Sequence, residues 1–221
     1  MEDKEMGTLL EQQEKLFEEW KHGREYFVTD GVVNEAEYIK APKKLLFLLK
    51  EVNGGGSWPL CEFLENGGRA RTWDNVARWV EGIYNIDKEI PWSSLDADKE
   101  SNTQRRKAML KTICAVNVKK SPGIDTSVPN EIKRAGIQDA EFLKKQIAIY
   151  NPEIIICCGT DGVYSKSLAR EKLDWKRTNR GIWYTLDGER IVIAYVHPEA
   201  RVQSSLIYYG LIDAVKEIFC E

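Results

Sequence analysis

Four short apolar runs constrain the fold of this chain more than any other feature. They lie near 44–49, 112–117, 153–158 and 191–196, and stretches with helical periodicity separate them. Runs of this length are typical of buried strands, and strands that alternate with helices form parallel sheets. The sequence therefore predicts an α/β fold: a single three-layer α/β/α domain with a mostly parallel four-stranded sheet.

Helices are predicted where apolar side chains recur about every 3.6 residues. They are expected over residues 7–23, 72–85, 103–110, 138–150, 163–171 and 203–219. A hairpin is expected over 173–186, and residues 86–103 are expected to form a loop. We divide the chain into an N-terminal helical extension, residues 1–42, packed on an α/β domain, residues 43–221.

Composition limits the classes of function. The chain has 221 residues, with 32 basic and 35 acidic side chains and a net charge of −3. This balance excludes a protein that binds nucleic acid mainly through bulk positive charge, although a local basic groove remains open. No stretch of residues is apolar enough to span a bilayer, and no signal peptide follows Met1, so we expect a protein that does not enter membranes.

The cysteines and histidines argue against a metal centre. The five cysteines are odd in number and none are spaced as C-x2-C, and the chain has two histidines, His22 and His197. The usual ligand sets for zinc or an iron–sulfur cluster cannot be assembled from them without a coincidence of folding. We therefore expect no metal and no cofactor, and we expect reduced thiols and a cytoplasmic location.

Polar side chains and glycines follow each predicted strand. In an open parallel sheet, ligands bind beyond the carboxyl ends of the strands, so these positions are the candidate site. We expect Glu51, Asn117 and His197 to converge on one cleft there. The glycines at 54–56 could equally form a turn or cradle a ligand. The segment at 159–162 is more typical of a turn. Nucleotide-binding glycine fingerprints are absent from the sequence.

The order of these motifs resembles the uracil-DNA glycosylase superfamily. The matching segments read K-E-V-N-G at 50–54, A-V-N-V-K-K-S-P-G at 115–123, N-P-E-I-I-I-C-C-G at 151–159 and V-H-P at 196–198. The iron–sulfur branch of that superfamily reads G-E-A-P-G, N-V-V-K-C-R-P-P-G-N, a proline before a hydrophobic strand and glycine, and H-P. Here Lys50 and Asn53 replace the first glycine and the proline, and the cluster cysteines are missing.

The resemblance implies a role for individual residues. Glu51 matches a position that orients or activates the attacking water, and His197 matches the histidine that stabilises charge on the departing base. Asn117 matches an asparagine near the base pocket. The loop from Pro198 to Arg201 matches one that approaches the DNA backbone.

Cleavage of a base from DNA also requires groups that bind the flipped base and the DNA backbone. A base must be flipped out of the stack and held by an aromatic face and an amide, so we expect Trp58 and Asn53 to join Asn117 in binding it. Trp58 is as easily a core residue. DNA-backbone contacts are expected from Lys50, Gly54, Gly55, Lys119, Lys120, Arg201 and Ser204.

Three functions remain open at this stage. The first is a DNA glycosylase that cleaves the N-glycosidic bond of uracil or another modified base, with DNA as its partner. The second is the same fold kept as a nucleic-acid or protein-binding module without turnover. The third is a hydrolase of free nucleosides or nucleotides, which the low net charge suits.

Overall fold

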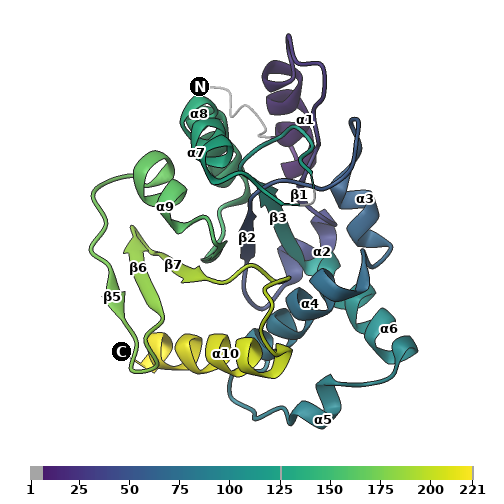
Figure 1. Cartoon of the computed structure of the whole chain (residues 1–221), viewed down its shortest axis with the longest axis vertical. Coiled ribbons are helices and arrows are strands. Elements are labelled where there is room, and N and C mark those ends of the chain that lie inside the picture. Colours follow the sequence, from purple (N-terminus) through teal and green to yellow (C-terminus); the bar gives the residue numbers. More distant parts are fainter. Residues whose placement is uncertain (1–6, 125, 221) are drawn as a thin grey trace.

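Strands and helices alternate along the chain in the computed structural model, which describes residues 7–124 and 126–220 (Figure 1). The strands are β1 Gly31–Val32, β2 Leu45–Leu49, β3 Ile113–Asn117, β4 Ile154–Cys158, β5 Lys176–Arg177, β6 Trp183–Asp187 and β7 Arg190–Tyr195. The helices are α1 Leu9–Trp20, α2 Glu35–Lys40, α3 Leu60–Glu65, α4 Ala70–Tyr84, α5 Trp92–Leu95, α6 Lys99–Met109, α7 Pro129–Gln138, α8 Ala140–Tyr150, α9 Asp161–Val163 and α10 Ser204–Cys220. A 3₁₀ turn, η1 Leu110–Thr112, and a π-helix, η2 Tyr164–Leu168, complete them.

All four apolar runs form strands, and these strands are parallel. Strand β2 pairs with β3 on one side and β4 on the other, and β4 pairs with β7. The α/β fold class is thus confirmed. The expected number of strands is wrong, because the sheet has seven strands in the order β1-β3-β2-β4-β7-β6-β5. The added strands β1, β5 and β6 run antiparallel at the two edges.

The sequence pattern explains why the three added strands were not predicted as part of the sheet. Strands β1 and β5 have two residues each, too few to show any period. Strand β6 belongs to the hairpin expected over 173–186, and its pairing with β5 confirms that hairpin. Its pairing with β7 then extends the parallel sheet with antiparallel strands.

Two apolar cores cover the two faces of the sheet. Alternate residues of β2 point to opposite faces: Phe47 packs with Trp79 of α4, while Leu48 lies in a second cluster with Trp20 of α1. Helices α4 and α10 lie on one face and α1 and α8 on the other (Figure 1). Helix–sheet–helix layering follows from strands that are apolar on both sides.

The helix predictions are confirmed for five of the six segments; over 163–171 the chain instead forms the end of the three-residue α9 and the π-helix η2, which ends at Leu168. Helices α4 and α10 match 72–85 and 203–219 closely. The region 86–103 is not all loop, because it holds α5 and the start of α6, which Asp98 caps by accepting from Ser101 N at 3.0 Å. Helix α7 precedes α8 as a separate element.

The N-terminal segment contributes to both a helical layer and the sheet. Thr8 and Glu11 form a capping box at the start of α1, and Trp20 near its end stacks on Phe142 of α8 at 5.2 Å between ring centroids. Strand β1 pairs with β3. Residues on both sides of position 42 thus share one sheet, and the division at 42 stays a prediction.

Membrane and metal features can be stated for the described residues. Within 7–124 and 126–220, every helix is too short or too polar to cross a bilayer. The same residues include no group of three or more His, Cys, Asp or Glu side chains placed to hold a metal ion. The five cysteines are free thiols.

Candidate functional site

The carboxyl ends of the four parallel strands meet at one edge of the sheet. Glu51 follows β2, Asn117 ends β3, and His197 follows β7. Strand order puts β4 between β2 and β7, so the backbones that carry Glu51 and His197 are about 10 Å apart at this edge. The chain thus brings these three residues to the same edge from positions far apart in sequence.

Glu51 is a buried carboxylate paired with a lysine. Its side chain is 4% exposed, and Oε2 accepts from Lys119 Nζ at 2.6 Å. Gly123 permits this arrangement, because a Cβ at that position would lie 2.1 Å from the Glu51 carboxyl carbon. Gly123 N donates to Val52 O at 2.8 Å and ties the 119–123 loop to the loop after β2.

Lys119 is shared between two carboxylates. Its Nζ also contacts Glu131 Oε2 of α7 at 3.3 Å. Partial burial lowers the pKa of Lys119, but hydrogen bonds and charge from Glu51 and Glu131 outweigh it and raise the pKa above its ordinary value. Lys119 therefore stays charged at neutral pH and holds Glu51 in place.

His197 sits in a turn that fixes its tautomer. Its Nδ1 accepts from the backbone N–H of Glu199 at 3.2 Å, and Ala200 N donates to His197 O at 2.9 Å. Burial lowers the pKa of His197 and the charge of Lys50 lowers it further, while Glu199 acts in the opposite direction. A neutral imidazole that accepts at Nδ1 carries its proton on Nε2, so His197 presents a hydrogen-bond donor there.

A polar stripe on α4 holds the His197 loop. Asn75 Nδ2 donates to Pro198 O at 2.7 Å, and Thr72 Oγ1 donates to Glu199 Oε2 at 3.2 Å. Arg69, just before α4, forms an ion pair with Glu199 at 3.2 Å. Residues three apart lie on one helix face, so a single face of α4 positions this loop.

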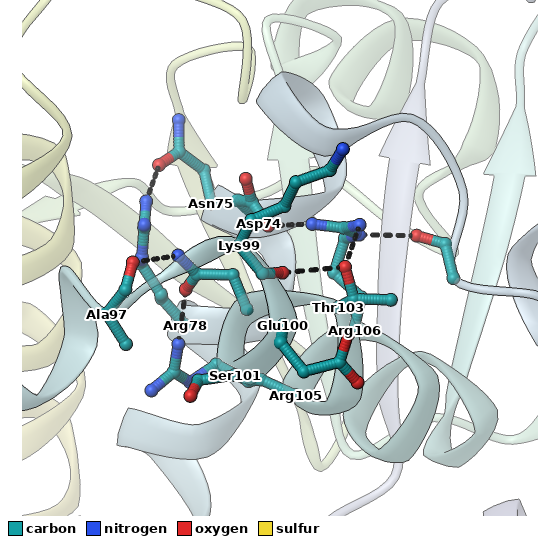
Figure 2. Close-up of polar contacts among 12 residues, drawn as sticks. Asp74, Asn75, Arg78, Ala97, Lys99, Glu100, Ser101, Thr103, Arg105 and Arg106 are labelled. Carbon is teal, nitrogen blue, oxygen red and sulfur yellow. Dashed lines mark hydrogen bonds and ion pairs between the residues drawn. The ribbon is translucent and has the colours of Figure 1, made fainter.

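Arg78 continues the stripe and orients Asn75. Its NH1 donates to Asn75 Oδ1 at 3.3 Å (Figure 2). Its Nε donates to Leu95 O at 3.0 Å. The guanidinium also lies over the Trp92 ring at 5.1 Å. With its oxygen on Arg78, the Asn75 amide must present its nitrogen to Pro198. Sequence analysis missed these residues, although polar side chains every third position on an apolar helix were a usable signal.

We predict that Asn75→Ala lowers the free energy of unfolding by about 1–3 kcal/mol, because it leaves a buried carbonyl without its donor. The pKa of His197 should also move toward its ordinary value as the loop loosens, and histidine NMR resonances report this directly. Asn85→Ala is the matched control, since the Asn85 amide donates locally to Glu81 O at 2.8 Å. If Asn85→Ala shifted the pKa of His197 by as much, Asn75 would have no specific role in positioning the His197 loop.

The Lys50 side chain, just after β2, reaches the turn after β4. A Cβ at Gly159 would be 3.5 Å from Lys50 Nζ, and the charge of Lys50 acts on both His197 and Cys158. No hydrogen bond or ion pair of Lys50 Nζ is found among residues 7–124 and 126–220. Its ammonium is thus available at the rim of the sheet.

We predict that Lys50→Met raises the pKa of His197, because it removes a nearby positive charge. With a lowered pKa in the folded state, the stability that His197 contributes is complete above about pH 6.5 and is lost as pH falls toward that lowered pKa. NMR titration in a His22→Gln background leaves one histidine to follow. Lys111→Met, at a distant surface, serves as the control; an unchanged His197 pKa in Lys50→Met would refute the interaction.

Asn117 is held by a buried polar network rather than by open solvent. It is 1% exposed, its backbone N–H donates to Asp30 Oδ2 at 2.7 Å, and its Nδ2 donates to the same oxygen at 3.3 Å. The amide nitrogen therefore already has a partner. Sequence analysis did not identify Asp30, which lies 87 residues earlier in the chain.

The expectation that Lys120 contacts the DNA backbone is wrong in this structure. Its side chain is 0% exposed, and Nζ donates to Asp30 Oδ1 at 2.6 Å and to Gln146 Oε1 at 2.9 Å. The ammonium also lies 4.7 Å from the Trp20 ring centroid. A lysine enclosed in this way anchors the loop after β3 and cannot reach a phosphate.

The glycine loop after β2 is open and carries an aromatic pair at its end. A Cβ at Gly54 or Gly55 would meet nothing within 4 Å, and φ is +121° at Gly54. Asn53 is exposed, and its backbone pairs with Gly123. Trp58 is partly buried and packs edge-on against the exposed Phe63 at 5.6 Å, so a partly accessible aromatic surface borders this loop.

The remaining expected contacts lie after His197. Arg201 is exposed, and Ser204 is the partly buried first residue of α10. Both are therefore near the loop that α4 holds. Trp73, in contrast, lies in the buried stripe of α4.

Comparisons with known proteins add no relative. No protein-family model matches the chain, and no curated protein matches it.

Proposed function

We propose that this protein is a DNA glycosylase-like hydrolase that cleaves the N-glycosidic bond of uracil or another modified base in DNA. The observation that carries the proposal is the shared sheet edge at which a buried carboxylate, Glu51, and a neutral imidazole, His197, follow parallel strands. Breaking such a bond leaves positive charge on the sugar and negative charge on the base. The two side chains have the chemistry to meet each charge.

His197 supports the proposal through its tautomer. The backbone of Glu199 occupies Nδ1, so Nε2–H is the donor that would stabilise the departing base. Lys50 adds a positive charge beside it. A donor held by its own loop and by α4 needs little reorganisation when charge develops.

Glu51 supports the proposal through its second carboxylate oxygen. Lys119 binds Oε2, and Oε1 would position a water and offset the charge on the sugar. Trp58 and Phe63 would supply the aromatic face for a base that has left the stack. The superfamily resemblance in the sequence assigns the same roles to Glu51 and His197.

Backbone binding is proposed for Lys50, Lys119 and Arg201. Lys119 lines a cavity of about 170 Å³ together with Arg24, Ser121 and Arg134, and the carboxylates Glu131 and Asp139 also line it and pair with Lys119 and Arg24. A phosphate there would have to compete with these carboxylates for the cations. Such contacts carry no base information.

We predict that Arg201→Ala weakens binding to single-stranded DNA of any sequence and reduces the slope of log K against log salt by about 0.7, as loss of one phosphate contact does. Fluorescence anisotropy at several salt concentrations measures this. Arg177→Ala removes an equal charge from the edge strand β5, outside the group of parallel strands, and should leave the slope unchanged. Equal slopes for Arg201→Ala and the parent protein would exclude this contact.

One observation favours the binding-module alternative. The Glu51 side chain is 4% exposed and ion-paired, as a purely structural carboxylate would be. The deciding experiment is release of free base from single- and double-stranded oligonucleotides that carry a panel of modified bases, compared with release from nucleosides. Release from oligonucleotides supports the glycosylase, release from nucleosides alone supports the third function, and DNA binding without release supports the module.

A further inference from the structure

A second cavity lies at the opposite end of β7 from His197. It has a volume of about 370 Å³ and is lined by residues of α8, the end of η2 and the start of β7. Arg190, which lines it, is the first residue of β7, while His197 lies beyond the last. At about 3.3 Å per residue the two lie about 20 Å apart, so this cavity is separate from the proposed site.

The polar lining of this cavity is cationic. Lys144, Arg170 and Arg190 line it, and none of the described lining residues carries a carboxylate. Arg190 is 7% exposed, with Nε fixed by Pro152 O at 3.1 Å and NH1 3.8 Å from Asp187. A buried guanidinium held from behind is preorganised to present its remaining N–H groups to an anion.

The other two cations can move toward a ligand. Arg170 is exposed, and no ion pair of its guanidinium is found within residues 7–124 and 126–220. Lys144 pairs with Glu141 at 3.0 Å, but both side chains are largely exposed and such a pair is weak. Both cations can therefore exchange solvent or a surface partner for a bound anion.

The rest of the lining is apolar. Ile147, Ala148, Leu168 and Ala169 form it. Leu168 ends the π-helix η2, a rare element that is frequent at functional sites. Binding sites combine an apolar wall with a few converging polar groups in a volume of roughly 300–1,000 Å³, and this cavity meets each condition.

We propose that this cavity binds a small anion with an apolar body, its carboxylate or phosphate head on Arg170, Arg190 and Lys144 and its body on the α8 and η2 side chains. The site is independent of the proposed glycosylase activity, because it uses none of the same residues. Recognition rests on charge at the rim and apolar contact at the wall, so both parts of the ligand are required.

The experiment uses the full chain and three ligands with one alkyl chain: octanoate, octyl phosphate and octanol. Each is titrated against bound anilinonaphthalene sulfonate, a fluorescent aromatic anion. We expect the preferred anion to displace the probe at a concentration at least about tenfold below that of octanol, the factor that one charge-assisted hydrogen bond supplies. Comparison of octanoate with octyl phosphate identifies the head group.

Variants locate the site. Arg170→Ala and Lys144→Ala should each weaken the anion about fivefold to tenfold, whereas Lys145→Ala, an adjacent lysine that does not line the cavity, should not. Ala148→Phe should block binding with no change of charge, on an exposed helix position that tolerates it. Thermal unfolding checks that each variant folds. Absence of binding, equal competition by octanol, or equal weakening by Lys145→Ala would overturn the proposal.

Discussion

Asp30→Ala is expected to lower the free energy of unfolding by about 3–5 kcal/mol, because it leaves the charge of Lys120 buried and unpaired. Both side chains are 0% exposed and 2.6 Å apart. Burial lowers the pKa of Lys120, and the charge of Asp30 opposes that shift. Asp30 also accepts from the Asn117 backbone at 2.7 Å and from Gln146 at 2.9 Å. The variant therefore leaves several buried donors without their acceptor.

Urea unfolding measures this effect, and two variants serve as controls. Glu141→Ala breaks the exposed Lys144–Glu141 pair and should cost less than about 1 kcal/mol. Asp30→Ala combined with Lys120→Met removes both charges and should be less destabilised than Asp30→Ala alone, since an apolar replacement needs no partner. If Asp30→Ala costs no more than Glu141→Ala, the pair does not anchor the loop after β3.

The central strands were predictable because they carry their signal locally. Residues 45–49 and 154–158 are fully buried on both faces, so each reads as an uninterrupted apolar run. Their positions along the chain agree with the structure to within about a residue. The edge strands have no such signal, because β1 pairs through two residues whose place is set by β3.

The lysines at 119 and 120 show what sequence could not decide. They are adjacent and identical in type, yet Lys119 bridges Glu51 and Glu131 while Lys120 is enclosed against Asp30. The difference comes from Asp30, a partner 90 residues away. Side-chain alternation after a strand determines which lysine points inward, and the residue that meets it is known only from the fold.

The candidate site divides in the same way. Placement of Glu51 and His197 at one edge follows from strand order and from the rule for parallel sheets. The groups that hold them do not, since Asn75 lies more than 120 residues from the carbonyl that it binds. Sequence thus indicated the two candidate side chains, whereas the groups that hold them could be identified only from the structure.

His197→Ala and Glu51→Gln are each expected to slow base release by about 100-fold or more on the best substrate, with little loss of stability. The His197→Ala variant lacks the Nε2 donor that would stabilise negative charge on the base, and one such donor is worth about 10²–10³ in rate. Glu51→Gln would lose the negative charge that positions water and faces the sugar, worth about 10²–10⁴. Single-turnover rates with saturating protein isolate the chemical step from DNA binding.

Each variant has a matched control in the chain. His22→Ala removes the other histidine, which lies outside the sheet edge, and Glu131→Gln removes the other carboxylate on Lys119. Neither should change the rate more than about twofold if the roles belong to His197 and Glu51. Urea unfolding separates chemistry from stability, since Glu51→Gln also weakens the ion pair with Lys119. If His197→Ala kept full activity, His197 would not be the leaving-group donor. If Glu51→Gln and Glu131→Gln lowered the rate of base release equally, the role of Glu51 would be to hold Lys119 rather than to activate water.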